Sequence, residues 1–463
     1  MTYPLGLTAF EESLVQDDRP AYPWNFVLRL RFAGCLHRSP LERALADSVA
    51  RHPLLRARVS RLQDRRCVWV PAEPHPLRWS EGPRAAREET LSPLKIEEEA
   101  GLRVSASVDG DGTELILQFH HACCDGAAGF QFAEEWLTRY AAYASERSAP
   151  ALPPVDSQRL PGRNRFGLTA TRVLRLFVPQ LSGLFGVREF LARKPVPLRP
   201  HELRLRDSSP APDYPAALTA HLDPNATRKF RAAARQQGAT LNDLALRDLF
   251  VTLIEWRHDL KIGDEQDWLR IMVPMNLRSA ADVELPAANV VSSVFLDRRK
   301  EDGRDEADLL RSLHEQMDLI KRRHLGFTYI LSLVVARMLP GGLARHHWDE
   351  RCVATASLSN LGEPWATSPL TGSDGRLTIG DAVLTDVEGL GPLRPQTCAG
   401  FSLLTYAGRL GVSLHYDSRA LSSTEAADLL DRYVDRLHRS ADAERRFVGK
   451  KRPIAQTAGE PAP

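Results

Sequence analysis

Alternating apolar and polar positions predict a β-hairpin in the first third of the chain. Residues 102–108 alternate, and residues 113–119 return as a strand rich in large apolar and β-branched side chains. The residues 109–112 between them, Asp-Gly-Asp-Gly, have the composition of a hairpin turn. The second strand leads into His-His-Ala-Cys-Cys-Asp-Gly at positions 120–126, and the small and apolar residues after it predict a helix. The hairpin therefore delivers these polar residues to one end of a sheet.

Alternation with a period of two and helical spacing of three to four residues predict the other elements of the chain. Further strands are expected at residues 25–32, 269–278, 288–296, 353–358, 400–406 and 409–416. Helical spacing, with capping residues at several starts, predicts helices near residues 39–51, 131–145, 222–235, 240–253, 305–323 and 422–437.

One segment differs in composition from the rest. Between Asp156 and Arg206, eleven Lys and Arg residues accompany three Asp and Glu residues, interleaved with large apolar side chains. One interpretation is an amphipathic patch, residues 159–206, on an anionic membrane surface; the other is a crossover whose basic face is solvated. We therefore expect an N-terminal half at 1–155, a basic linker at 156–212, a C-terminal half at 213–445 and a disordered tail at 446–463.

Composition narrows the class of protein. The chain has 463 residues, 43% of them hydrophobic and 26% charged, which is typical of a soluble protein of two or three domains. The net charge of +2 gives no case for a nucleic-acid partner. Six cysteines without framework spacing, and no visible signal peptide, indicate a cytoplasmic protein. The longest apolar stretch, residues 329–339, is shorter than the roughly 20 residues that cross a bilayer.

The paired histidines carry the candidate chemistry. Adjacent residues on a strand point to opposite faces, so only one of His120 and His121 can face a given cleft. A neutral imidazole can accept a proton, as a general base must, and we assign that role to His121 and a structural role to His120. Asp125 can fix the loop by pairing with a cation or with backbone amides. Gly126 suits a position where a side chain would clash or where φ is positive.

Three other roles are open to the residues of this motif. His121 can be an ordinary structural histidine. The nearby His, Cys and Asp side chains can all bind zinc, but no further ligand spacing completes a site, so we expect no metal. Cys124 can be a nucleophile, although nothing in the sequence marks a lowered pKa; both thiols fit small buried positions better.

His-His-x-x-x-Asp-Gly after a strand resembles the active-site motif of a superfamily of CoA-dependent acyltransferases. It includes chloramphenicol acetyltransferase, condensation domains of peptide synthetases, polyketide-associated acyltransferases, alcohol acetyltransferases and the wax ester synthase/diacylglycerol acyltransferase group. The resemblance implies an α/β fold of two chloramphenicol acetyltransferase-like halves, each a mostly antiparallel sheet with helices, around a central channel. It also implies an ion pair between Asp125 and the arginine of the Val-Pro-Met-Asn-Leu-Arg segment, Arg278.

Two further segments resemble parts of this superfamily. Thr-Leu-Asn-Asp at 240–243 is similar to a helix start in wax ester synthases and condensation domains, and its Asn242 is either a cap or a substrate contact. Ser-Asn-Leu-Gly at 359–362 resembles a sequence of alcohol acetyltransferases and polyketide-associated acyltransferases. There Ser359 and Asn360 are either oxyanion donors or parts of a plain turn. Later condensation-domain motifs are missing, as are the signatures of plant acyltransferases and of wax ester synthases. Ser-Asn-Leu-Gly favours a free-standing O-acyltransferase.

The resemblance implies transfer of an acyl group from an acyl-CoA or acyl-carrier thioester to the hydroxyl of an alcohol or lipid. No bound cofactor is expected, the chain is expected to be a monomer, and an acyl carrier protein is a candidate partner. Two alternatives stay open. One is a condensation-type enzyme that forms amides or esters from carrier-bound donors, and the other is a scaffold that has the fold without the chemistry.

Overall fold

The chain folds into two halves, each built on a six-stranded sheet. We analysed a computed structural model, which describes residues 3–63, 66–82, 91–110, 112–148, 150–165, 183, 186–200, 209–343 and 351–442. The N-terminal sheet has the order β12(Thr378–Ile379), β13(Ala382–Leu390), β2(Asn25–Ala33), β7(Gly112–His120), β6(Leu102–Val108), β5(Arg78–Glu81). The C-terminal sheet has the order β10(Val291–Arg298), β9(Leu269–Asn276), β11(Ala356–Asn360), β14(Ala399–Tyr406), β15(Arg409–Tyr416), β8(Ala217–Leu222).

Both sheets are mostly antiparallel, as the resemblance implied. The parallel pairs are β5 with β6 and β11 with both of its neighbours. A separate small sheet joins β1(Leu5–Gly6), β4(Cys67–Pro71) and β3(Ala57–Arg61). The expected hairpins at 102–119 and 400–416 are confirmed, and the second turns through Ala407 and Gly408 with φ values of 46° and 75°. Positive φ at both turn residues matches the twist of a two-residue hairpin.

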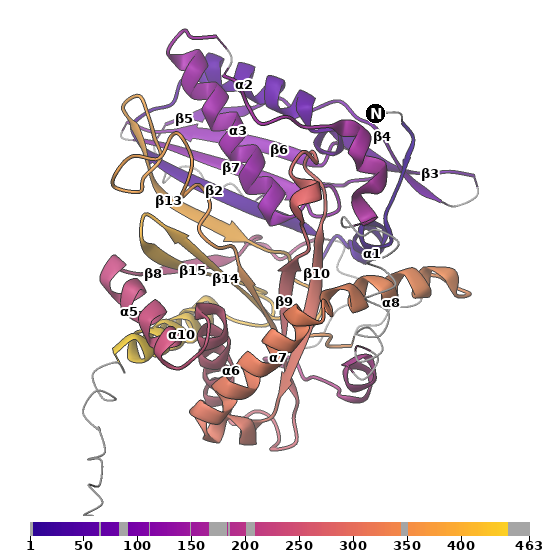
Figure 1. Cartoon of the computed structure of the whole chain (residues 1–463), viewed down its shortest axis with the longest axis vertical. Helices are drawn as coiled ribbons and strands as arrows, with labels where there is room; N and C mark the ends of the chain where they lie inside the picture. The colour runs from indigo at the N-terminus through magenta and orange to yellow at the C-terminus, as the bar shows by residue number, and fades with distance from the viewer. Residues whose placement is uncertain are drawn as a thin grey trace, which may run out of the picture.

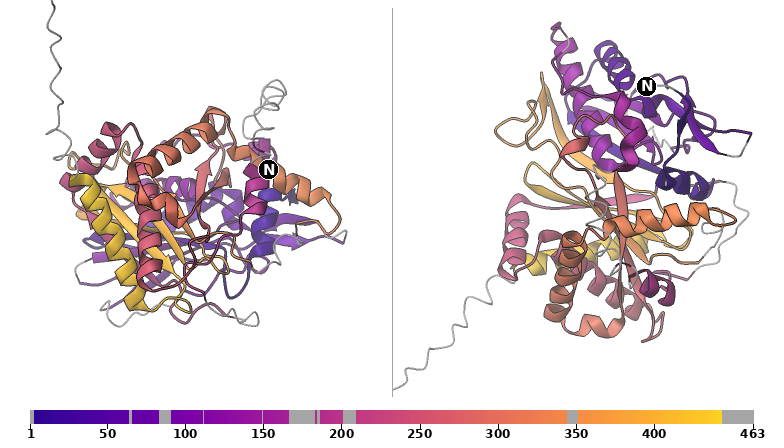
Figure 2. Two further views of the ribbon diagram at one scale, coloured as in Figure 1. Left: turned by 90° about the horizontal axis from the view of Figure 1, so that it is seen from below. Right: turned by 45° about the vertical axis from the view of Figure 1, so that its right-hand side comes forward.

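Helices cover one face of each sheet (Figure 1). In the N-terminal half these are α2(Arg38–Arg51) and α3(Gly126–Ala144), with α1(Ala9–Asp17) at the junction. In the C-terminal half they are α5(Pro224–Gln236), α6(Leu241–Asp259), α7(Glu306–Arg322) and α10(Ser423–Asp442). A further helix, α8(Gly326–Met338), runs out from the side of the molecule (Figure 2). No described helix is long and apolar enough to cross a membrane.

Each half has its own hydrophobic core. Leu115, Leu117 and Phe119 of β7 are fully buried, as expected for the buried strand that this apolar run predicted. They belong to a cluster that includes α3, while a second cluster lies between the C-terminal sheet and α6, α7 and α10. Burial of one face of each sheet under helices therefore accounts for both halves.

One strand crosses from the second half into the first sheet, which the sequence did not predict. β13 lies within the range expected for the C-terminal half, yet it pairs with β2 along Val383–Leu390. In Figure 1 this orange strand lies beside the violet strand β2 of the N-terminal half. The two halves are therefore joined through a shared sheet.

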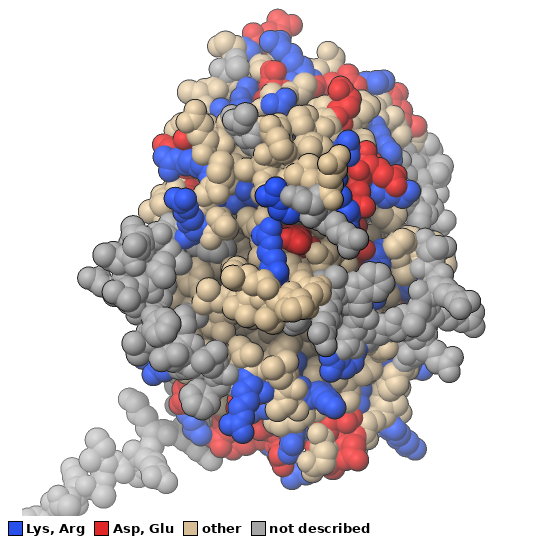
Figure 3. Space-filling view, turned by 90° about the vertical axis from the view of Figure 1, so that its right-hand side faces the viewer, with Lys and Arg blue, Asp and Glu red and all other residues tan. Residues whose placement is uncertain are grey.

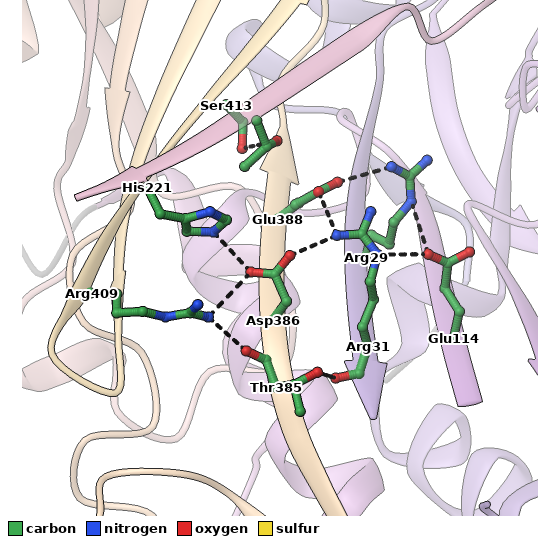
Figure 4. Close-up of polar contacts among 10 residues, drawn as sticks. Arg29, Arg31, Glu114, His221, Thr385, Asp386, Glu388, Arg409 and Ser413 are labelled. Atoms are coloured by element: carbon green, nitrogen blue, oxygen red, sulfur yellow. Dashed lines mark hydrogen bonds and ion pairs between the residues drawn. The ribbon is translucent and has the colours of Figure 1, made fainter. Parts of the chain in front are cut away.

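Charged side chains gather where β13 meets both halves, and we call them the crossover cluster (Figure 4). Arg31 of β2 lies 2.6 Å from Asp386, 2.7 Å from Glu388 and 3.0 Å from Glu114. Asp386 also accepts a hydrogen bond from Nε2 of His221 on β8 at 3.0 Å. The members of the cluster are Arg29, Arg31, Glu114, His221, Asp386, Glu388 and Arg409.

Candidate functional site

The sequence His120–Gly126 forms the turn between β7 and α3, and we call it the motif turn. β7 ends at His120 and is paired with β2 on one side and with β6 on the other. The amide of His121 donates to the carbonyl of Trp24 at 2.7 Å, just beyond the end of the strand. The position of the motif turn is therefore set by the central strands of the sheet.

His120 is fully buried. Its Nδ1 accepts a hydrogen bond from the amide of Ala122 at 3.2 Å. Nε2 lies 3.2 Å from a carboxylate oxygen of Asp18, next to the end of α1. These contacts suit a residue that holds the motif turn in place.

His121, in contrast, is only half-buried. Its ring meets the edges of two aromatic rings, with centroid distances of 6.0 Å to Trp24 and 5.3 Å to Phe26. Nδ1 is buried and makes no hydrogen bond with another described residue. The side-chain amide of Asn289 donates to the backbone carbonyl of His121, which ties this residue to the second half.

Burial lowers the pKa of His121, and the neighbouring His120 lowers it further. The backbone carbonyl of His121 and the charge of Asp125 act in the opposite direction, but burial prevails. The imidazole is therefore neutral at pH 7, which is the state in which it can accept a proton.

Asp125 is buried and makes the contacts that join the motif turn to the second half. Nη1 of Arg278 lies 2.8 Å from Oδ1 and 2.7 Å from Oδ2, so the ion pair implied by the resemblance is present. Oδ2 also accepts from the amide of Val290 at 2.8 Å, and Oδ1 caps α3 through the amide of Ala128 at 3.0 Å. Arg278 donates in turn to the carbonyl of Ala288 at 2.9 Å. We call these residues the motif anchor.

Gly126 is not required for either reason expected from the sequence. Its φ is not positive, and a Cβ there would meet only Leu361 Cδ2 at 3.6 Å, an ordinary contact. Gly389 of β13 is different, because a Cβ there would lie 2.5 Å from Leu361. Leu361 therefore lies beside both glycines, which brings the end of β11 close to the start of α3.

The three predicted substrate contacts, Ser359, Asn360 and Asn242, lie in two different elements. Ser359 and Asn360 end β11, one residue before Leu361, and Asn360 Oδ1 accepts from the amide of Gly362 at 3.0 Å in a turn. Asn242 lies in the first turn of α6, where Thr240 and Asp243 form the capping box instead. The Oδ1 atom of Asn242 is buried without a hydrogen-bond partner among the described residues. Within the described hydrogen bonds, none joins Asn242 to the motif turn.

The two thiols of the motif turn are buried. Cys123 Sγ donates to the carbonyl of His120 at 3.0 Å. Burial raises the pKa of Cys124 well above its usual value, which keeps the thiol protonated. A nucleophilic role for Cys124 therefore has no support in its surroundings. Among the described residues, no three His, Cys, Asp or Glu side chains are grouped as metal ligands would be.

Several residues of the site were missed by sequence reasoning. Ala288–Val290 were expected to begin a strand, but β10 starts at Val291 and these three residues form a loop against the motif turn. Trp24 and Phe26, which flank His121, were not singled out either. The one signal in the sequence is the asparagine itself, a polar residue among the apolar ones at 287–291, and it is a weak one.

Comparison with known sequences finds distant relatives. No family model matches the chain. Two uncharacterized proteins, one from each of two strains of Mycobacterium tuberculosis, are 28% identical to it over 382 residues. The match covers 78% of this chain and 84% of each relative.

Solved structures resemble the chain over nearly its whole length. The first condensation domain of the calcium-dependent antibiotic synthetase aligns with a TM-score of 0.70 at 18% identity, covering 95% of this chain and 96% of that domain. Polyketide synthase associated protein 5 from Mycobacterium tuberculosis aligns with a TM-score of 0.64 at 14% identity, covering 95% and 98%. The starter condensation domain of rhizomide synthetase, in complex with C8-CoA and Leu-SNAC, gives 0.67 at 12% identity, covering 95% and 94%.

The chain therefore has the fold of condensation domains. This is the fold that the resemblance of its motif implied, and it accounts for both sheets and for the helices on them.

Proposed function

We propose that the chain is an acyltransferase that moves an acyl group from a thioester donor to a hydroxyl of an alcohol or lipid acceptor. The observation that carries this proposal is the contrast between the two histidines of the motif turn. His120 is locked in the core, whereas His121 is half-buried, has a lowered pKa and is held through its backbone. Such a ring is neutral, positioned and available, as a general base must be.

The proposed reaction needs one proton carrier. Nδ1 of His121 is buried, so we assign Nε2 as the nitrogen that takes the proton from the acceptor hydroxyl. The oxygen then attacks the thioester carbonyl, the C–S bond breaks, and the imidazolium returns its proton to the leaving thiolate. No acyl-enzyme forms. One positioned base contributes about 10²- to 10⁴-fold, so the remaining acceleration comes from holding both substrates together.

The transition-state oxyanion needs donors, and Ser359, Asn360 and Asn242 remain the candidates. Ser359 and Asn360 are supported by their position next to Leu361, which lies beside the first residue of α3. Asn242, in the first turn of α6, is a candidate through its carboxamide nitrogen, which is a donor. Asp125 and Arg278 act as positioning residues and carry no proton in this scheme.

Thiol release tests the assignment. His121→Ala should lower transfer from a panel of acyl-CoA donors to alcohols by about 10²-fold or more, with the circular dichroism spectrum unchanged. His258→Ala, on the exposed end of α6, is the matched control and should leave the rate unaltered. Full turnover by folded His121→Ala protein would refute the role of His121.

The pH profile is a second test. A base with a pKa below the usual value near 6.5 stays neutral until the pH falls through that lowered value. The acid limb of kcat/KM should therefore have its midpoint below pH 6.5. A midpoint above 6.5 would contradict the assignment of a buried, neutral imidazole.

The similarity to condensation domains favours one other donor, a thioester on a carrier protein. C8-CoA is a suitable first donor because the rhizomide synthetase domain was solved with it. Activity that appears only with a pantetheinylated carrier would favour condensation chemistry. Absence of thiol release with either donor class would favour a scaffold. The monomeric state and the membrane contact through 159–206 stay predictions, and much of that segment lies outside the described residues.

A further inference from the structure

The helix α8 is apolar on two opposite faces. Its inner face carries Ile330, Leu333 and Ala336, which are buried in the core of the N-terminal half. Tyr329 adds ring contacts to Phe10 at 6.3 Å and Phe295 at 5.8 Å. These contacts account for one side of the helix only. A surface helix of a globular protein normally has a polar outer face, and α8 does not.

The outer face carries large apolar side chains in contact with solvent. Their exposed fractions are 48% for Leu331, 40% for Val334, 56% for Val335, 81% for Met338 and 53% for Leu339. Spacings of three and four residues place them on one line along the helix, and we call this line the outer stripe. They make up half of the large hydrophobic residues that are exposed in the described parts of the chain. Such a concentration marks an interaction surface.

Basic residues border the outer stripe along the chain. From Leu319 to Leu343 there are four Lys and Arg residues and no Asp or Glu. Two of the four are paired with acids outside this range, Arg322 with Asp318 at 2.6 Å and Arg337 with Glu12 at 3.0 Å. Three of them, Lys321, Arg322 and Arg323, precede the helix and are exposed, and the fourth is Arg337 within it. In Figure 3, which looks onto this side, uncharged side chains gather at the level of α8, with Lys and Arg groups above and below them and some Asp and Glu groups above them.

A second exposed apolar residue belongs to a neighbouring segment. The ring of Phe190 packs on Phe295 at 4.8 Å, and Phe295 packs on Tyr329 of α8. Leu191, the next residue, is 71% exposed. Arg188 and Lys194 are exposed on either side of it. The same segment also holds exposed Glu189, which pairs with Arg193 at 2.8 Å, so Leu191 has two exposed cations and one ion pair as its neighbours.

We propose that the outer stripe docks on an anionic lipid surface, with α8 lying in the plane of the interface. The helix has 13 residues, too few to span a bilayer, but an amphipathic helix needs only to bury its apolar face among the lipid headgroups. The bordering cations would attract anionic headgroups while the apolar side chains enter.

The shape of this surface favours lipid over a protein partner. α8 projects from the side of the molecule as a ridge in both views (Figures 1 and 2). A stable protein interface buries about 800 Å² on each partner with close shape complementarity, which a single projecting helix supplies poorly. A second copy would also bring the same positive charges together. A lipid surface accommodates a convex ridge and supplies the opposite charge.

Flotation of the full chain with vesicles tests the proposal. The wild-type chain should float with phosphatidylcholine vesicles that contain phosphatidylglycerol, and less with pure phosphatidylcholine. The variant Val335→Glu/Met338→Glu should bind about tenfold more weakly or worse, because both side chains lose their apolar contact. The matched control is Leu260→Glu, which makes the same kind of change at an exposed apolar residue at the end of α6. It should bind as the wild type does.

Three results would overturn the proposal. The first is that the wild-type chain does not bind anionic vesicles. The second is that wild type and the double variant bind them equally. The third is that the wild-type chain dimerises with rising concentration in sedimentation, that the double variant does not, and that neither binds vesicles. The last result would assign the outer stripe to a second copy. Acyl transfer between water-soluble substrates should be the same in wild type and variant, so the outcome does not depend on the proposed chemistry.

Discussion

Two groups of charged residues join the N-terminal sheet to the second half, and they differ in how many partners each charge has. In the motif anchor, the buried carboxylate of Asp125 has one cation, Arg278. In the crossover cluster, Arg31 has three acidic partners, and the side chains of the cluster are between 6% and 34% exposed. A pair depends on both of its members, whereas a network whose charges have several partners each can lose one member and keep contacts among the rest.

The two groups of charges also differ in what they position: the motif anchor positions the proposed base, and the crossover cluster joins the two halves. The motif anchor contacts the loop that holds the carbonyl of His121, so a disturbance there reaches the proposed base directly. The crossover cluster holds β13 against β2, β8 and β15, where its charges set how the two halves are joined (Figure 4). We therefore expect changes in the motif anchor to affect stability and turnover together, and changes in the cluster to affect stability alone.

The largest effect is expected from Asp125→Ala. The variant leaves Arg278 without its counterion, removes the cap of α3 and frees the amide of Val290. The loss of one member of a buried pair costs about 3–5 kcal/mol. Urea denaturation should show a decrease of this size in the free energy of unfolding. A soluble Asp125→Ala protein with wild-type stability would show that the motif anchor does not stabilise the fold.

Arg278→Lys should have the next largest effect. A lysine can keep one charged contact with Asp125, but it cannot also donate to the carbonyl of Ala288. Loss of that hydrogen bond predicts a decrease of about 1–2 kcal/mol in unfolding free energy, with reduced kcat and little change in KM. The matched control is Arg432→Lys on the exposed face of α10, which should be neutral. Equal changes in unfolding free energy in the two variants would mean that the contacts of Arg278 contribute no more than those of an exposed arginine.

Sequence reasoning found the elements of the site but not their surroundings. A run of large apolar and β-branched side chains predicted β7, and the Gly and small residues after it predicted the turn, because both are local patterns. The Asp125–Arg278 pair came from the resemblance and was confirmed. Asn289 was missed because a hydrogen bond to a backbone carbonyl 168 residues away leaves no local pattern. The crossover of β13 was missed for the same reason, since a strand's partner is fixed by tertiary packing.

Glu388→Ala should have a smaller effect than either change in the motif anchor. Its side chain is 6% exposed and contacts Arg29 at 2.9 Å and Arg31 at 2.7 Å. After its removal both arginines keep Glu114, and Arg31 keeps Asp386. We expect a decrease of about 1 kcal/mol, measured by urea denaturation, with kcat unchanged. A loss as large as that of Asp125→Ala would show that the crossover cluster is not redundant.

The smallest effect, and the one with a pH signature, belongs to Asp386. Burial raises the pKa of its carboxyl, but the hydrogen bond from His221 and the charges of His221, Arg31 and Arg409 outweigh burial and lower it below the usual 3.8. A carboxyl with a lowered folded pKa adds stability above its unfolded pKa, and this contribution is lost as the pH falls through the folded value. Asp386→Asn should therefore be less stable than wild type by less than about 1 kcal/mol at pH 6, and the difference should shrink below about pH 4. Asp428→Asn, from an exposed pair on α10, is the control. If the difference in unfolding free energy between Asp386→Asn and wild type grows as the solution is acidified, the pKa of Asp386 is raised and not lowered. Burial of Asp386 would then outweigh its partners.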